Sequence, residues 1–528
     1  MINKSLLREH QKMDSSLNLE YNNVCDLLSA KVKENNEKVF LICPGKDNDQ
    51  FTYSEFKAIV DQTSKFLIQS GLKKNDKISL IFHNSPEFLI LYFAGLSCGL
   101  TIVPINPDLS SREIKYIIED SESKHVFYNH TLESKIVSIG NDLTNITLTK
   151  TRTIKELTSS TDNEINFEQN KTSLYDAAVI IYTSGTTGNP KGVILTHLNL
   201  LSDAMSISNW FKFNKETRCL CILPLFHNNG QITTLLAPLY AGGSTVIVKG
   251  KISLYAFWDL VNEYKATWTS VMASILSILL SFPKEREDDS LTGILCGGQI
   301  LTRSVQELFE KRFNVPIFEG YGLTETTSFS CINGYPADKR KIGSIGKPLL
   351  TNEMKILNEN NDVGSNVEGE ICIRGYNVSS GYIGDEEKNN DVFRNGWFHS
   401  GDYGKKDKDG YFYFHGRKDS LIIKGGENIY PAELENVLYQ HPYVDECAVI
   451  GVPDELLGEE ICAFVKIKND KSLTENELKV FCKDKIAEYK QPRKIIIIND
   501  LVDLDDIPKG PTKKILYRKL KEYFIKNQ

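Results

Sequence analysis

The sequence predicts an α/β protein with a large N-terminal domain of several subdomains and a small α+β C-terminal domain. Short β-branched segments alternate with helical patterns through the first 400 residues, which is the signature of α/β layers. From about residue 335 short strands with turn signals dominate, and a compact α+β pattern follows residue 418. A chain of 528 residues is too long for one ordinary core. We therefore expect domains at residues 1–418 and 419–528.

The first part of the chain begins with two strand-like runs around a helix. Residues 77–82 and 101–104 are rich in β-branched and aliphatic side chains, and residues 86–98 between them are amphipathic with a helical period. A stretch rich in Asn, Ser, Thr and Glu, residues 155–173, is expected to be a surface excursion. Further strands of the same β-branched kind are predicted at residues 177–182, 193–196 and 244–248.

The later elements are marked by turn and capping residues. An Asp-Gly pair predicts a hairpin turn at residues 408–411. Pro431 suits the first position of a helix, which we expect Pro442 to end. The remaining predicted elements are a strand at 370–375, a helix at 474–488, a strand at 494–498 and a basic loop at 508–516.

Composition and charge exclude several classes of protein. The chain is 41% hydrophobic and 25% charged, as in ordinary globular proteins, and its net charge of −7 argues against nucleic acid as a partner. No integral membrane segment is expected, because no apolar stretch reaches ~18 residues. The N-terminus lacks the apolar core of a secretory signal. The eleven scattered cysteines form no Cys-x-x-Cys pair, which is typical of reduced, mostly buried thiols in a cytoplasmic protein. The sequence leaves the oligomeric state open.

A loop of glycine, serine and threonine that ends in a lysine lies between two of the predicted strands. Glycines let backbone N–H groups approach phosphate oxygens, hydroxyls add donors, and Lys191 adds a positive charge. This is not a Walker A loop, because a strand rather than a helix resumes at Val193. The loop is expected to hold a triphosphate through Thr183, Ser184, Gly185, Thr186, Thr187, Gly188 and Lys191.

Residues 182–192 resemble the signature of the adenylate-forming (AMP-binding) superfamily, which includes the acyl-CoA synthetases, and the resemblance covers residues 20–525. It implies that a carboxylic acid, fatty or aryl, reacts with ATP and Mg²⁺ to give an acyl-adenylate. The acyl group then passes to a thiol, which is coenzyme A in the favoured interpretation. Two alternatives stay open: an acyl-AMP ligase that loads a separate acyl-carrier protein, and a catalytically impaired, ligand-binding relative.

Residues 319–325 resemble the second core motif of this superfamily. The resemblance implies that the Tyr321 ring stacks on adenine, that Thr324 meets the α-phosphate and that Glu325 binds the metal. Mg²⁺ prefers hard oxygen ligands and takes few protein carboxylates beside phosphates, which fits this assignment. The glycines that the same resemblance assigns to nucleotide binding are Gly298, Gly320 and Gly322.

A Trp-x-x-Ser-Gly-Asp segment that ends at Asp402 is similar to a further motif of the superfamily. The resemblance implies that Asp402 accepts hydrogen bonds from the ribose hydroxyls, a task suited to a carboxylate, and that Arg417 joins it. Asp419 corresponds to the hinge about which the C-terminal domain turns. Gly425 and Gly426 resemble the loop that lines the thiol tunnel.

The C-terminal tail resembles the segment that carries the catalytic lysine of the superfamily, which places that lysine at Lys514. Two positions depart from the usual pattern. Gly510 stands where threonine is usual, and Lys513 replaces the glycine that normally precedes the lysine, which removes backbone freedom. The alignment of the tail with the superfamily pattern favours Lys514 over Lys513 as the catalytic lysine.

The acid is expected to bind near residues 223–230, which resemble the acyl-pocket segment of acyl-CoA synthetases. The resemblance implies that His227 positions the substrate carboxylate, as a catalytic residue beside Lys514, Thr324 and Glu325. Amino-acid-activating relatives carry an aspartate where Asn228 falls, so an α-amino acid is not expected. The predicted pocket residues, mostly apolar, are Phe226, His227, Asn228, Val271, Ala273 and Ile275.

Overall fold

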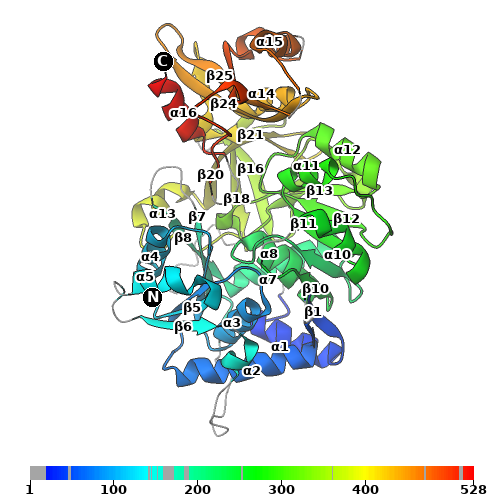
Figure 1. Cartoon of the computed structure of the whole chain (residues 1–528), viewed down its shortest axis with the longest axis vertical. Helices are drawn as coiled ribbons and strands as arrows, with labels where there is room; N and C mark the ends of the chain where they lie inside the picture. The colour runs from blue at the N-terminus through cyan, green and yellow to red at the C-terminus, as the bar shows by residue number, and fades with distance from the viewer. Residues whose placement is uncertain are drawn as a thin grey trace.

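A computed structural model describes most of the chain as four β-sheets with helices packed around them (Figure 1). Of Asp419 and Asn428 it describes the backbone only. The described residues are 19–45, 49–140, 143, 146–151, 153–158, 172–183, 189–250, 254–358, 361–468, 471–483, 485–510 and 515–527.

The first sheet has the strand order β6-β5-β3-β4-β7-β8. Its first five strands are parallel, and β7 turns back into β8 as an antiparallel pair. The strands predicted from β-branched runs are confirmed, and helix α3 (Pro86–Ser97) begins with Pro86 behind the capping hydroxyl of Ser85. The bounds are β3 Lys77–Ile81, β4 Thr101–Ile105, β5 His125–Asn129, β6 Thr147–Thr151, β7 Ala177–Thr183 and β8 Lys191–Thr196.

The second sheet runs in the order β15-β14-β13-β12-β11-β9-β10-β1-β2. Strands β9 to β13 are parallel neighbours, so their carboxyl ends lie along one edge of the sheet. Helix α7 (His197–Trp210) is buried from His197 to Ser208. The bounds are β1 Val39–Cys43, β2 Asp49–Thr52, β9 Arg218–Cys221, β10 Ser244–Ile247, β11 Trp268–Val271, β12 Gly293–Cys296, β13 Ile317–Tyr321, β14 Cys331–Ile332 and β15 Lys347–Pro348.

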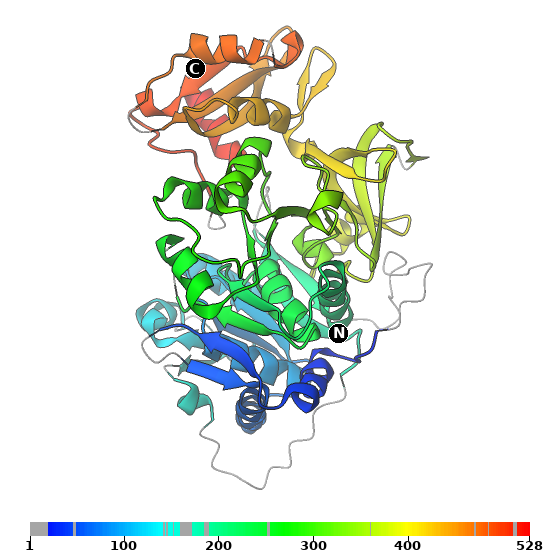
Figure 2. The same ribbon diagram turned by 90° about the vertical axis from the view of Figure 1, so that its right-hand side faces the viewer.

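The third sheet is antiparallel and lies beside the second (Figure 2). The predicted turn at 408–411 joins β20 to β21, but the connection is longer than a two-residue hairpin. The carboxylate of Asp407 accepts the N–H groups of Asp409 and Tyr411, at 2.9 and 3.0 Å, and so holds the wider loop. The bounds are β16 Asn352–Asn358, β17 Asn361–Asp362, β18 Glu368–Gly375, β19 Phe393–Arg394, β20 Trp397–Lys406 and β21 Phe412–Arg417.

The fourth sheet belongs to the C-terminal part, which stands at one end of the molecule (Figure 1). The third sheet ends at Arg417 and this one begins at Ile422; the domain boundary at 418/419 stays a prediction. The bounds are β22 Ile422–Lys424, β23 Glu427–Ile429, β24 Val444–Asp454, β25 Gly458–Ile467, β26 Lys494–Ile497, α14 Pro431–Leu438, α15 Glu475–Lys483 and α16 Tyr517–Lys526.

Two predicted helix ends are wrong. Helix α14 starts at Pro431 as expected but ends at Leu438, because the N–H of Gln440 turns back to the carbonyl of Val437 well before Pro442. Helix α15 ends at Lys483 instead of 488. The N–H groups of Lys485 and Ile486 both bond to the carbonyl of Cys482, which closes the last turn.

All eleven cysteines lie in described residues, and each is buried and free of any disulfide, as the sequence predicts. Burial raises the pKa of the Cys43 and Cys221 thiols to about 12. Within the described ranges, no helix combines the length and the apolar character needed to cross a membrane.

Candidate active site

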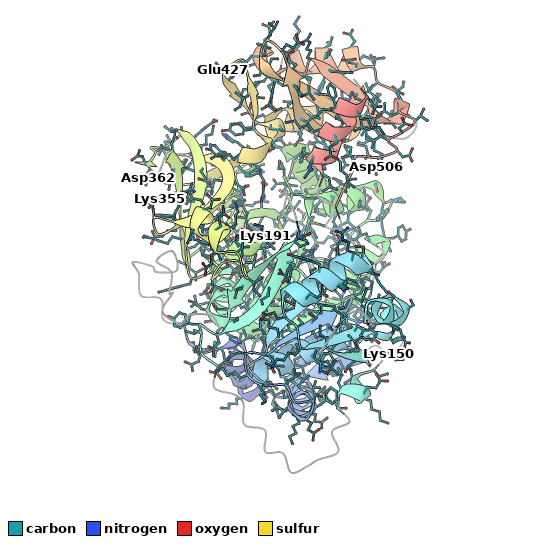
Figure 3. All side chains as sticks on the ribbon, turned by 90° about the vertical axis from the view of Figure 1, so that its left-hand side faces the viewer. Lys150, Lys191, Lys355, Asp362, Glu427 and Asp506 are labelled. Atoms are coloured by element: carbon teal, nitrogen blue, oxygen red, sulfur yellow. The ribbon has the colours of Figure 1, made fainter. Side chains whose placement is uncertain are left out.

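The predicted phosphate loop is the connection between β7 and β8. Thr183 and Lys191 are directly opposed in this hairpin, so the strands fix both ends of the loop. Ser184, Gly185, Thr186, Thr187 and Gly188 lie outside the described residues. The ammonium of Lys191 lies 2.6 Å from the carboxylate of Asp385 and 5.9 Å from the centre of the Tyr382 ring. Figure 3 shows Lys191 near the middle of the molecule.

Thr324 and Glu325 form a short 3-10 turn just after β13. Two hydrogen bonds hold Glu325. Its carboxylate Oε1 accepts the hydroxyl of Tyr382 at 2.7 Å, and its backbone carbonyl accepts the N–H of Ser379 at 2.8 Å. The side chain is partly exposed, and among the described residues none bonds to Oε2. A partly exposed carboxylate with one oxygen available is a donor set that fits Mg²⁺.

The turn is strained at Thr327, where φ is 67° and ψ is −70°. The N–H of Ser328 reaches back to the carbonyl of Thr326 at 2.8 Å, so Thr327 is the centre of a γ-turn of the rare, positive-φ kind. For a β-branched residue this conformation costs about 1–3 kcal/mol and persists only where surrounding structure enforces it.

Buried side chains enforce that conformation. The Asn228 amide donates to the carbonyls of Thr324, at 3.4 Å, and Thr327. Asn377, with no exposed surface, donates to the carbonyl of Thr326 at 3.2 Å and accepts the Thr327 hydroxyl on its own carbonyl at 2.6 Å. The side chain of Asn228 therefore supports the motif turn.

Gly322 has a packing role in the same turn. A Cβ at this position would lie 1.7 Å from the carbonyl oxygen of Ser328. Only glycine permits the approach, so this motif glycine is required by the turn itself. Gly298 has φ +78° in an exposed loop, a conformation that also favours glycine.

The carboxylate of Asp402 is 2% exposed and faces the nucleotide motif. It accepts the Tyr321 hydroxyl at 2.7 Å and lies 3.1 Å from Nε of Arg417, which is its direct partner across β20 and β21. Burial, and then the Asp402 charge, raise the pKa of Tyr321. Asp402 thus joins the two other side chains assigned to adenine and ribose, although the three come from separate segments.

The predicted acyl-pocket residues lie on two neighbouring segments. The rings of Phe226 and His227 are 4.7 Å apart at the start of α8 (Asn228–Gln231). Ala273 and Ile275 lie in α11 (Ala273–Ser281) after β11. Val271, the last residue of β11, has no exposed surface and packs in the same hydrophobic core cluster as Ile275.

The structure does not bring the predicted thiol-tunnel glycines to the nucleotide residues that it describes. Lys514 lies outside the described residues. Gly425 and Gly426 form the turn between β22 and β23, at the outer side of the C-terminal part, where Figure 3 labels Glu427. Asp419 lies in a 3-10 turn (Lys418–Ser420) between the third and fourth sheets.

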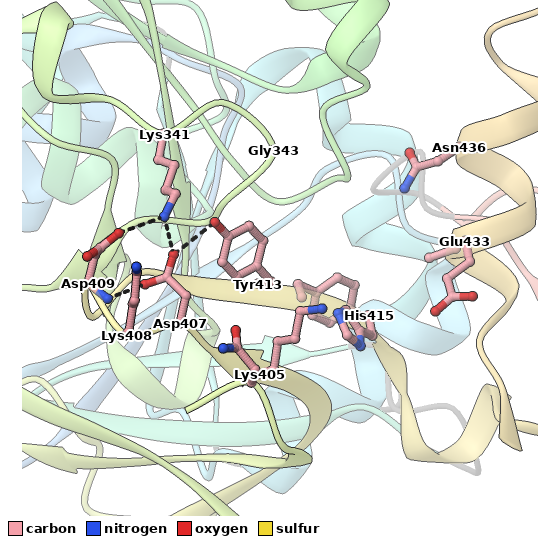
Figure 4. Close-up of a pocket in the computed structure, with 13 residues that line it drawn as sticks. Lys341, Gly343, Lys405, Asp407, Lys408, Asp409, Tyr413, His415, Glu433 and Asn436 are labelled. Carbon is pink, nitrogen blue, oxygen red and sulfur yellow. Dashed lines mark hydrogen bonds and ion pairs between the residues drawn. The ribbon is translucent and has the colours of Figure 1, made fainter. Parts of the chain in front are cut away.

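A cavity of about 560 Å³ lies elsewhere, between the third sheet and α14 (Figure 4). Lys341 bonds there to Asp407 and Asp409, at 2.5 and 3.1 Å, and His415 and Glu433 line the opposite side. None of the predicted site residues that the structure describes lines this cavity. Lys341 is paired with both aspartates and Glu433 with Lys490, at 2.5 Å, so we do not assign the cavity to the reaction.

Several residues at the site were not predicted from the sequence. Tyr382 and Asp385 follow β18 and contact Glu325 and Lys191, and Asn377 supports the motif turn. The pattern Gly-Tyr-x-Gly-Asp at residues 381–385 is the one local signal that could have drawn attention to them.

The chain belongs to the AMP-binding enzyme family. Residues 28–383 match that family and residues 433–505 match its C-terminal domain. It is 34% identical to an oxalate–CoA ligase of Arabidopsis thaliana over 94% of this chain and 98% of that protein. It is 33% identical to a 2-succinylbenzoate–CoA ligase of Bacillus pumilus over 92% of this chain and 95% of that protein.

Solved structures agree with this assignment. The o-succinylbenzoate CoA synthetase of Bacillus subtilis, in complex with its acyl-adenylate intermediate, matches with a TM-score of 0.84 and 30% identity over 95% of this chain and 98% of that one. An anthranilate CoA ligase in complex with anthranoyl-AMP matches with a TM-score of 0.88 and 25% identity over 96% and 98%. The predicted α/β fold with a smaller C-terminal domain is confirmed.

Proposed function

We propose that the chain is an AMP-forming carboxylic acid–CoA ligase. The observation that carries the proposal is the assembly of Tyr321, Glu325 and Asp402, with Lys191 beside them, from three segments spread between residues 191 and 402. The substrate carboxylate attacks the α-phosphorus of ATP, the bond to the β-phosphate oxygen breaks, and acyl-adenylate and pyrophosphate form. A thiol then attacks the acyl carbon, AMP leaves, and the thiol proton is released to water.

In this proposal the chain acts by positioning and charge neutralisation. Asp402 and Arg417 hold the ribose, Tyr321 holds adenine, and the loop with Lys191 holds the phosphates. Glu325 would hold Mg²⁺, which supplies charge neutralisation at the phosphates when bound. His227 orients the acid, and Lys514 neutralises charge that develops at the α-phosphate.

The second step requires the C-terminal domain, residues 419–528, to turn about Asp419. Gly425 and Gly426 would then reach the site and line the path of the thiol, while Lys514 withdraws. The present distance of the β22–β23 turn from the site supports such a movement (Figure 3), which would be a hinge motion.

Coenzyme A is the proposed acceptor, since the relatives at this level of identity are named CoA ligases. The acids in their names are oxalate and 2-succinylbenzoate, and a structural relative acts on anthranilate. These names favour an aryl or short organic acid over a long-chain fatty acid. The eleven buried cysteines, none of which forms a disulfide, support the cytoplasm as the compartment.

The test separates the two half-reactions. Pyrophosphate exchange with a panel of aryl, short dicarboxylic and fatty acids reports adenylation, and thioester formation is measured with coenzyme A and with a phosphopantetheinylated carrier protein. We expect exchange with a subset of the acids and transfer to coenzyme A. Absence of exchange with every acid would support the ligand-binding relative, and transfer to the carrier alone would support the acyl-AMP ligase.

The Lys514→Ala variant should lose adenylation by several orders of magnitude, because the cation proposed to neutralise charge at the α-phosphate is removed, yet form thioester from supplied acyl-adenylate. Lys513→Ala is the matched control and should retain most of both activities. If Lys513→Ala loses adenylation and Lys514→Ala keeps it, the assignment belongs to Lys513.

A further inference from the structure

We infer that Tyr382 is a positioning residue that couples the metal-binding carboxylate of Glu325 to Lys191 of the phosphate loop. This inference rests on the proposed function. Neither the motif analysis nor the names of the relatives assign a role to Tyr382. Its side chain is 8% exposed and touches both groups.

The first contact is with the metal carboxylate. The Tyr382 hydroxyl donates to Oε1 of Glu325 at 2.7 Å. A donor on Oε1 fixes the rotation of the carboxylate and leaves Oε2 directed elsewhere. Carboxylates that bind metals are commonly held by such hydrogen bonds.

The second contact is with the phosphate loop. The ammonium of Lys191 lies 5.9 Å from the centre of the Tyr382 ring, within the range of a cation–π interaction. The same ammonium lies 2.6 Å from Asp385, whose carboxylate also caps α13 (Glu386–Val392) by accepting the N–H of Lys388. Lys191 is therefore held beside Tyr382 from two sides.

The backbone of Tyr382 is fixed, which a positioning residue requires. The buried side chain of Asn389, in α13, accepts the Tyr382 N–H at 2.8 Å and donates to its carbonyl at 2.9 Å. Tyr382 also pairs with Val193 of β8, as a short extension of the first sheet. The backbone of Tyr382 is therefore fixed relative to β8, the strand that begins at Lys191.

These contacts join two sites that act on the same triphosphate. A shift of Lys191 toward phosphate moves a cation relative to the Tyr382 ring, and the hydroxyl of that ring orients the carboxylate for the metal. Binding of the metal–nucleotide complex should therefore depend on the hydroxyl, whereas the thioester step, which uses no triphosphate, should not.

The test compares wild type with Tyr382→Phe, which keeps the ring and removes the hydroxyl. Mn²⁺ binding in the presence of α,β-methylene-ATP, followed by electron paramagnetic resonance, should weaken about tenfold or more, as for other partners of metal ligands. Thioester formation from supplied acyl-adenylate should be unchanged. Tyr413→Phe is the control, because its hydroxyl donates to Asp407 at 3.1 Å away from the site.

A double-mutant cycle with Glu325→Gln isolates the contact. If the hydroxyl acts through Glu325, Tyr382→Phe should have little further effect on Mn²⁺ binding in the Glu325→Gln background. Unchanged Mn²⁺ binding in Tyr382→Phe would overturn the inference, as would equal losses in both half-reactions. Absence of pyrophosphate exchange in wild type would instead overturn the proposed function.

Discussion

Glu319 is a carboxylic acid in a buried position, where a negative charge is energetically unfavourable. It lies in β13 opposite Cys296 of β12 and is 8% exposed. Burial raises the pKa of Glu319 from 4.5 to about 8, and a hydrogen bond from the backbone of Leu301 offsets only part of this shift. The residue therefore keeps a proton near neutral pH, inside the motif that binds the nucleotide.

This proton gives the folded state a pH dependence. Between pH 4.5 and about 8 the folded chain retains the proton while the unfolded chain releases it, so stability falls as pH rises through this window. Glu319→Gln should unfold at the same temperature as wild type at pH 5 and at a temperature several degrees higher at pH 8. Differential scanning calorimetry measures this, with the exposed Glu216→Gln as control; equal curves at pH 8 would contradict it.

At the scale of the element, the turn 324–327 shows how a motif depends on residues outside it. The strained Thr327 is held by Asn228 from α8 and by Asn377 from the segment after β18. Neither contact could be predicted from the motif sequence, because Asn228 and Asn377 are 99 and 50 residues away from Thr327 along the chain. Phe329, just beyond the turn, donates its N–H to the fully buried Asp203 of α7.

Asn377→Ala should destabilise this turn, because it removes the buried amide that donates to the carbonyls of Thr326 and Phe329, at 3.2 and 3.4 Å. We expect a loss of about 2 kcal/mol or more, seen as a fall of about 4 °C or more in the apparent melting temperature. Pyrophosphate exchange should fall as well, since Thr324 and Glu325 lose support. Asn209→Ala, at an exposed position of α7, is the control; a melting temperature like that of the control would exclude the role.

The strands and the motif residues could be predicted from the sequence, but several residues that contact the motifs could not. Runs of β-branched residues predicted β3, β4 and β7 because buried parallel strands are nearly continuous in apolar residues. Helix ends such as that of α15 were missed, since the hydrogen bonds that close a last turn leave no periodic signal. Tyr382 and Asn377 were not predicted, because their roles depend on tertiary contacts that cannot be derived from a single sequence.

At the scale of the whole molecule, the groups proposed for the two steps lie in different parts. The adenylation residues that the structure describes gather in the large body, whereas the β22–β23 turn faces outward at the far side of the C-terminal part (Figure 3). One static arrangement therefore does not present Gly425 and Gly426 to the site, and the proposed thiol step depends on a change of orientation.

That change can be followed between two labelled positions. Lys150→Cys and Glu427→Cys place thiols on opposite parts of the molecule (Figure 3), and the eleven native cysteines are buried, so labels attach selectively. Single-molecule energy transfer should show a shift in the distance between the labels when acyl-adenylate and coenzyme A are added. A constant distance during active thioester formation would rule out the proposed rotation.

The burial of every cysteine affects which thiols can react with the acyl-adenylate intermediate. An acyl-adenylate is an electrophile that any nearby thiolate can capture, and the thiolate is the reactive form of cysteine. In this chain burial shields each thiol and raises the pKa of Cys43 and Cys221 to about 12, so these thiols stay protonated. The protein's own cysteines are thereby kept from capturing the acyl group, and the incoming substrate thiol meets no competing thiol on the enzyme's surface.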